Sequence, residues 1–189
     1  MSASTLVTTT TAGTRLGRNR AQIQRLVDTK LLPEVGKHGR TLLLDNDALQ
    51  ALAQRRQLAD TRNKNGTDSP YALALHLGPR AAEDYPTQNE RDYSGWDANE
   101  VNEDNQWTGW WNIGETIARE VTEARLPLLP AVSGFVVDVR IATGYDLHKP
   151  GMIRFHVADP SDDDRALFAD TVFTPVPGSP WQRLWAPST

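Results

Sequence analysis

Cysteine is missing from the chain, which excludes disulfides and thiolate ligands for a metal. No apolar run approaches the roughly 18 residues of a membrane-spanning helix, and the polar, Thr-rich residues 1–11 do not resemble a signal peptide. The sequence also lacks a Gly-rich phosphate loop, a Gly-x-Ser-x-Gly elbow and a kinase signature. We therefore expect a cytoplasmic protein that is not an enzyme and needs no cofactor.

A short amphipathic helix is expected over residues 19–29. Gly17 can adopt a positive φ in a tight turn before this helix, because it has no Cβ. Asn19 is a good N-cap, since its side-chain oxygen can accept an unpaired backbone N–H. Three apolar residues at helical spacing form one stripe: Ile23, Leu26 and Val27. We expect this stripe to pack inward.

The opposite face of the expected helix is rich in arginine and glutamine, with no acidic residue until Asp28. The members of this face are Arg20, Gln22, Gln24 and Arg25. Arginine and glutamine can pair bidentately with guanine or adenine edges in the major groove of DNA. We expect Arg20, Gln22 and Arg25 to contact bases, although solubility alone can also explain a polar helix face.

A β-hairpin is expected over residues 35–43, where two short apolar runs flank a basic loop that contains glycine. The residues that we expect to hold DNA phosphates, in this hairpin and in the turn before the helix, are Arg18, Asn19, Lys37, His38 and Arg40. Phosphate contacts position a protein on a duplex but carry no sequence code. Residues 45–47 then supply caps for another helix, with Leu49 and Leu52 in its inner stripe.

Helix, turn, helix, hairpin and helix is the order of a winged helix-turn-helix. Residues 6–58 resemble the MerR/excisionase class of these domains in Leu16-Gly17, in the inner stripe, in Leu31-Leu32-Pro33, in the hairpin loop and in the acid-capped last helix. The resemblance implies that the second helix enters the major groove and that the hairpin touches the adjacent backbone. Two features depart from the class. Lys30 stands where glycine is usual, and the first helix would come from Thr-rich residues 9–16 of poor helix propensity.

Charge is distributed unevenly along the chain. Residues 1–64 hold 11 Lys and Arg against 5 Asp and Glu, whereas residues 65–189 hold 9 against 19. This asymmetry is typical of one domain that meets phosphates and another that faces solvent or protein, although two ordinary domains can also differ in charge by chance. We expect a DNA-binding domain over residues 1–60, a polar linker over 61–70 and an acidic α+β domain over 71–189.

The second domain is expected to contain a small antiparallel sheet covered by one helix. Its strands are expected over residues 71–77, 135–141, 152–157 and 166–173. The helix is expected over residues 113–125, with residues 126–130 ending it. The inner stripe of that helix is expected to contain Ile113, Ile117, Val121 and Ala124. At the other end of the chain, residues 1–8 are expected to form a loose arm.

Two further groups of residues invite a functional interpretation. All six tryptophans lie after residue 95, and we expect them to pack as core side chains, with a partner surface as the alternative. His148 and His156 flank an expected hairpin turn near several aspartates. Because neither a His-Glu-x-x-His motif nor an EF-hand spacing is present, we expect solvated carboxylates and no metal site.

Together these features predict a sequence-specific double-stranded DNA-binding regulator of transcription, such as a repressor, of bacterial or phage type. The acidic domain would supply dimerisation, a regulatory ligand site or contact with another protein, and no membrane is expected as a partner. Two alternatives stay open. One is an accessory DNA-binding protein of a phage or mobile element, acting in packaging or excision. The other is a protein-interaction factor whose helix-turn-helix does not bind nucleic acid.

Overall fold

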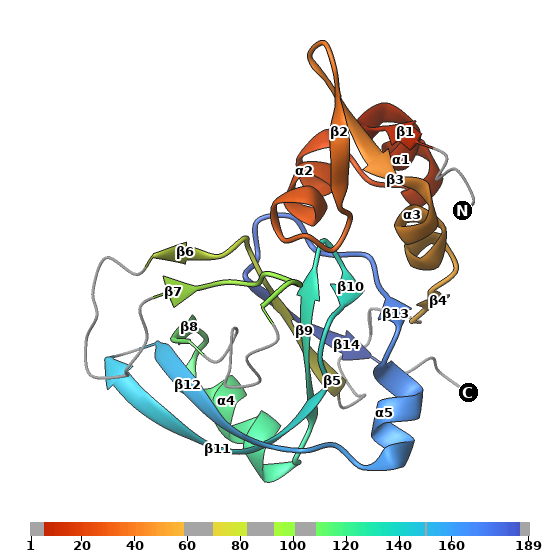
Figure 1. Cartoon of the computed structure of the whole chain (residues 1–189). Helices are drawn as coiled ribbons and strands as arrows, with labels where there is room; N and C mark the ends of the chain where they lie inside the picture. The colour runs from red at the N-terminus through yellow and green to blue at the C-terminus, as the bar shows by residue number, and fades with distance from the viewer. Residues whose placement is uncertain (1–5, 59–69, 83–92, 101–108, 150, 186–189) are drawn as a thin grey trace. The chain divides into compact units, whose positions relative to one another are not determined.

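The computed structural model describes residues 6–58, 70–82, 93–100, 109–149 and 151–185 (Figure 1). These residues form mixed α+β structure with five helices, and the chain divides into two compact units. The first unit contains Met1–Arg55 and Gly78–Gln106, and the second contains Arg56–Leu77 and Trp107–Thr189. Apart from Pro70, the expected linker over 61–70 lies outside the described residues, and the expected domain boundaries stay a prediction.

The first unit begins with strand β1 (Leu6–Thr8), which leads directly into helix α1 (Thr9–Leu16). The side chain of Thr8 caps α1 by accepting a hydrogen bond from the backbone N–H of Thr11 at 3.2 Å. The helix ends at Gly17 with a φ of 60°, as expected. The expectation of a loose arm is wrong for β1, because Val7 is buried and the strand pairs with a later one.

Helix α2 (Arg20–Asp28) is followed by the hairpin of β2 (Glu34–His38) and β3 (Thr41–Asp45), which confirms the expected hairpin (Figure 1). Strand β3 pairs antiparallel with both β2 and β1, so the small sheet has the order β1-β3-β2. Helix α3 (Asn46–Ala53) follows at once, and Asp45 caps it by accepting from the backbone of Asp47 at 2.8 Å.

One apolar core holds these elements of the first unit together. Helix α1 lies against α2, α3 and the small sheet. The residues that are fully buried here are Ala12, Ile23, Leu26, Leu32, Leu44 and Leu49. Burial of a single leucine or isoleucine side chain is worth about 1.5–3 kcal/mol, so this core is the main source of stability for the surrounding short helices.

A two-stranded ribbon completes the described part of the first unit. It consists of residues 78–82 and 93–100, with β6 (Ala81–Ala82) paired antiparallel to β7 (Tyr93–Ser94). Gly95 has a φ of 90°, and a Cβ at this position would lie 2.3 Å from the carbonyl oxygen of Pro79. Only glycine can occupy this position without moving the backbone.

The ribbon is bonded to the end of α2. The backbone N–H of Ala98 donates to the carbonyl oxygen of Thr29 at 2.8 Å, and Thr29 is fully buried. Thr29 follows the last residue of α2, where carbonyls have no partner within the helix. A segment almost 70 positions further along the chain therefore completes the hydrogen bonding of this helix end.

The second unit contains one sheet of nine described strands. The strands are β4 (Arg56–Gln57), β5 (Pro70–His76), β8 (Trp111–Asn112), β9 (Pro127–Val132), β10 (Phe135–Val136), β11 (Arg140–Lys149), β12 (Met152–Ala158), β13 (Thr171–Val172) and β14 (Trp181–Trp185). Strand β9 lies at the centre, because it pairs with β5, β10 and β11 (Figure 1). All six residues of β9 are buried.

The sheet is mixed, so the expectation of an antiparallel sheet is only partly right. Strands β11 and β12 form a long antiparallel hairpin, and β14 pairs antiparallel with β5. Strand β5 runs parallel to β9, however, and β4 runs parallel to β13. Parallel pairs need long crossover connections, which a local apolar pattern does not reveal.

One expected helix end and one expected strand differ from the structure, whereas two expected strands are confirmed. Residues 126–130, expected only to end a helix, lie mostly in β9, where a pair of prolines obscured a fully buried strand. The strand expected over 135–141 is broken, because β10 and β11 are separated at residues 137–139. The strands expected over 71–77 and 152–157 are confirmed as β5 and β12.

The second unit has two helices where one was expected. Helix α4 (Glu115–Glu123) packs against β11 and β12, and its buried residues are Ala118 and Val121, whereas Ala124 is exposed. The strand expected over 166–173 is wrong for its first half, because residues 162–168 form helix α5 (Asp162–Phe168), and only residues 171–172 lie in a strand, β13. Ser161 caps α5, and three aspartates fill its first turn, where the helix dipole favours negative charge.

The tryptophans of the described ranges are all partly buried, so they act neither as fully enclosed core residues nor as fully open surface residues. They are Trp96, Trp110, Trp111, Trp181 and Trp185, and Trp107 lies outside the described residues. Within the described part of the chain, no helix is long and apolar enough to cross a membrane.

The residue after the C-cap of α2 is Lys30, and it has a left-handed φ of 61°. Its backbone N–H donates to the carbonyl of Val27 at 3.0 Å, and the N–H of Leu32 donates to the carbonyl of Leu26 at 3.0 Å. The left-handed residue and the bond from its N–H to Val27 match the helix ending that normally uses glycine. Lys30 therefore adopts a backbone conformation in which glycine is usual.

We expect Lys30→Gly to raise the free energy of unfolding by about 1 kcal/mol, because glycine adopts the left-handed conformation without the steric cost that a Cβ imposes. Urea unfolding followed by circular dichroism measures the change. Lys30→Ala, which keeps the Cβ and removes the charge, is the control and should not show this gain. An equal gain in both variants would contradict the backbone explanation.

Candidate nucleic-acid interface

Helix α2 begins with a reciprocal pair of capping hydrogen bonds. The side-chain oxygen of Asn19 accepts from the backbone N–H of Gln22 at 2.9 Å, and the side-chain oxygen of Gln22 accepts from the backbone N–H of Asn19 at 3.0 Å. The pair satisfies two backbone donors that a helix start leaves without partners. The capping role expected for Asn19 is confirmed, and Gln22 is its partner in that role.

The expected inner stripe of α2 is confirmed. Ile23 and Leu26 are fully buried, and Val27 is 4% exposed. Because an α-helix turns by 100° per residue, burial of these three positions directs residues 21, 24, 25 and 28 away from the core. All four of these residues are exposed.

The arginines of α2 are available at the surface. Arg20 and Arg25 are both exposed, and neither forms an ion pair among the residues that the structure describes. Gln24 is exposed as well, and its amide nitrogen donates to a side-chain oxygen of Asp28 at 2.8 Å. Gln22 differs from these residues, because it is half-buried and its side-chain oxygen binds at the helix start.

The tip of the hairpin presents the expected basic residues. Gly39 makes the turn between β2 and β3 with a φ of 60°, and His38 and Arg40 on either side of it are exposed. Lys37 is exposed too, and its Nζ lies 3.8 Å from a carboxylate oxygen of Glu34. An exposed ion pair of this length contributes little stability, so the lysine can exchange its partner readily.

Arg18, in the turn before α2, is less accessible than the other cations expected to hold phosphates. It is half-buried, and desolvation by burial lowers the pKa of its guanidinium. An arginine side chain nevertheless keeps its charge at neutral pH. Arg18 therefore places a fixed positive charge between α1 and α2.

Two residues of the outward face were not assigned a role from the sequence: Ala21 and Asp28. Both are exposed, at the positions where the rotation of α2 turns side chains fully outward. The spacing of Gln24 and Asp28 was the available signal, because side chains four positions apart are neighbours on a helix surface. The helix surface thus carries one carboxylate among its cations and amides.

The histidines of the second unit lie on the β11–β12 hairpin but do not converge. His156 Nε2 lies 3.0 Å from a carboxylate oxygen of Asp146, whereas the ring of His148 packs against Trp110 with centroids 5.1 Å apart. Among the described residues, no group of three or more His, Asp or Glu side chains is arranged to hold a metal ion.

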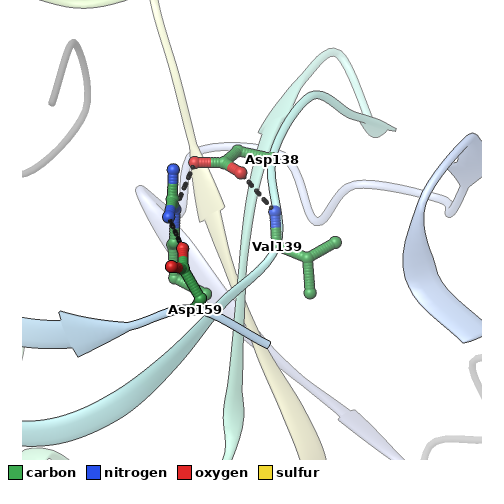
Figure 2. Close-up of polar contacts among 4 residues, drawn as sticks. Asp138, Val139 and Asp159 are labelled. Carbon is green, nitrogen blue, oxygen red and sulfur yellow. Dashed lines mark hydrogen bonds and ion pairs between the residues drawn. The ribbon is translucent and has the colours of Figure 1, made fainter. Parts of the chain in front are cut away.

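A polar cluster of the second unit joins the start of β11 to the end of β12. Asp138 and Asp159 both contact the guanidinium of Arg140, with Arg140 Nε lying 3.0 Å from a carboxylate oxygen of Asp138 (Figure 2). The other oxygen of Asp138 accepts from the backbone N–H of Val139 at 2.8 Å (Figure 2). Because the arginine is shared by two carboxylates, this cluster braces the start of β11 against the end of β12.

Comparison of the chain with protein-family models, with curated proteins and with solved structures found no match.

We expect Gln22→Ala to lower the free energy of unfolding by about 1 kcal/mol, because the variant leaves the backbone N–H of Asn19 without its acceptor. Gln22→Glu should keep most of the stability, since a carboxylate can accept the same bond. Gln24→Ala is the matched control, because Gln24 lies outside the cap. Urea unfolding measures all three variants. An unchanged midpoint for Gln22→Ala would contradict the capping role.

Proposed function

We propose that the protein is a sequence-specific DNA-binding regulator of transcription that acts without catalysis. The proposal assigns a winged helix-turn-helix to α1, α2, the β2–β3 hairpin and α3. The observation that carries it is the exposure of Arg20 and Arg25 on α2, without carboxylate partners in the described chain. Neither guanidinium forms an ion pair with a described residue, so both can bind a ligand. Arginine is the side chain that most often binds guanine edges.

The dimensions of α2 suit the major groove of B-DNA. A helix with its side chains is about 10–12 Å across, and the major groove is about 12 Å wide. Helix α2 would enter with Gln24 and Arg25 toward the base edges, because these residues lie opposite the buried stripe. Arg20 lies at the first helical position, where it can reach a base or a phosphate.

The hairpin supplies a second contact in this proposal. His38 and Arg40 are exposed at its tip, and the side chain of Lys37 is 62% exposed. These cations would bind the phosphate backbone beside the groove that α2 enters. They would fix the register of α2 on the duplex without reading sequence.

A single helix reads only a few base pairs, so useful specificity needs a second reading surface or a second copy of the protein. In the proposed function, the second unit provides this by dimerisation, by binding a regulatory ligand or by contact with another protein. The uneven charge of the chain supports the division, because residues 1–64 are basic and residues 65–189 are acidic.

We expect the whole chain to select related duplexes from a random-sequence pool, and Arg25→Ala to weaken binding to the selected site by about 1–3 kcal/mol with relaxed base preference. Fluorescence anisotropy with the selected duplex measures the affinity. Arg165→Ala removes an exposed cation from α5 and should leave the affinity unchanged. Equal affinity for the selected duplex and a scrambled duplex would contradict specific reading.

We expect Arg40→Ala to weaken binding to selected and scrambled duplexes alike, because a phosphate contact carries no sequence information. The slope of log K against log salt concentration should fall by about 1, since one counterion fewer is released. Titrations at several salt concentrations measure this slope, with Arg165→Ala again as the control. An affinity that does not change with salt, even for the unaltered chain, would favour the protein-interaction alternative.

A further inference from the structure

The fully outward face of α2 is formed by four residues at helical spacing. They are Ala21, Gln24, Arg25 and Asp28, and all are exposed. Positions i, i+3, i+4 and i+7 lie on one side of a helix, so these side chains share one surface opposite the buried stripe. If α2 enters the major groove, this is the surface that meets the base edges.

A hydrogen bond fixes the orientation of one amide on this surface. Gln24 Nε2 donates to Asp28 Oδ1 at 2.8 Å. An ionised carboxylate has no proton to donate, so the nitrogen and not the oxygen of the amide must face Asp28. The side-chain oxygen of Gln24 therefore points to the other side, and its second N–H remains available.

We propose that Gln24 reads an adenine in the major groove and that Asp28 is the positioning residue that orients its amide for this base. The inference rests on the proposed function. Adenine displays an acceptor at N7 and a donor at N6. The remaining N–H of Gln24 would donate to N7, while its side-chain oxygen would accept from N6. Guanine offers acceptors at both positions, so the oxygen of the same amide would face another acceptor.

The position of Asp28 is unfavourable both for the helix dipole and for binding to DNA. It lies in the last turn of α2, where the helix dipole disfavours negative charge. It would also bring a carboxylate close to a polyanion, at a cost to binding. A carboxylate that orients a reading side chain accounts for its presence on this face.

The test begins with the duplex selected from a random pool by the unaltered chain. Each adenine of that duplex is replaced in turn by guanine, and the affinity of every variant is measured by anisotropy. The unaltered chain should discriminate against guanine at one adenine by about tenfold. Gln24→Ala and Asp28→Ala should both lose this preference at that same position.

Two further variants separate the positioning role of Asp28 from the effect of its charge, and a melting temperature tests whether its replacement affects folding. Asp28→Asn keeps an oxygen that can accept from Gln24 and should retain most of the preference. Asp47→Ala removes another exposed acid of the first unit, from α3, and should raise affinity for all sequences alike while preserving the preference. The melting temperature of Asp28→Ala should not fall, because no buried contact is removed.

The outcomes distinguish this inference from the function on which it rests. If the unaltered chain binds no duplex, both are overturned. If it binds a selected site but Gln24→Ala leaves every adenine preference intact, only the reading role of Gln24 is overturned. If Asp28→Ala keeps the full preference that Gln24→Ala loses, the positioning role of Asp28 is overturned.

Discussion

The burial of one apolar stripe sets the rotation of α2 about its own axis, and the whole arrangement of its outward side chains depends on this rotation. Ile23, Leu26 and Val27 together contribute several kcal/mol through burial, at about 1.5–3 kcal/mol for each side chain. An exposed ion pair or amide contact contributes no more than about 1 kcal/mol. The surface interactions therefore cannot turn the helix, and the core decides which residues face outward.

The two ends of α2 complement this rotational constraint. The reciprocal cap of Asn19 and Gln22 determines where the helix begins, and the left-handed Lys30 determines how the chain leaves it. Because rotation and both ends are fixed by contacts inside the first unit, the outward face is preorganised. When Arg25 binds a ligand, the backbone that carries it is already ordered, so little backbone entropy is lost.

Much of the first unit could be predicted from the sequence because its signals are local. Gly17, the cap at Asn19 and the glycine-containing hairpin each depend on a few neighbouring residues. Site residues were harder to assign. A glutamine near a helix start can cap the helix or face a ligand, and only the geometry of Gln22 distinguished the two roles. Asp28 was given no role, although its spacing of four residues from Gln24 makes the two side chains neighbours on the helix surface.

The second unit shows where local patterns fail. The parallel pairing of β5 with β9 joins segments more than 50 residues apart, and no periodicity in either segment encodes that partner. Helix α5 was mistaken for a turn and a strand, because seven residues are too few to distinguish the two periodicities. The cap at Ser161 and the following aspartates were the better signal.

The bond from Ala98 to Thr29 has a consequence for how the first unit can be cut from the chain. A fragment that stops after α3 keeps every residue of the basic surface yet loses the donor that closes the last turn of α2. Water would have to replace that donor at a site that is fully buried in the intact protein. Truncation would thus destabilise the C-terminal end of α2 without changing its sequence. If such a fragment binds its ligand more weakly than the intact chain does, the cause can be this loss of helix order and not the loss of a residue that contacts the ligand.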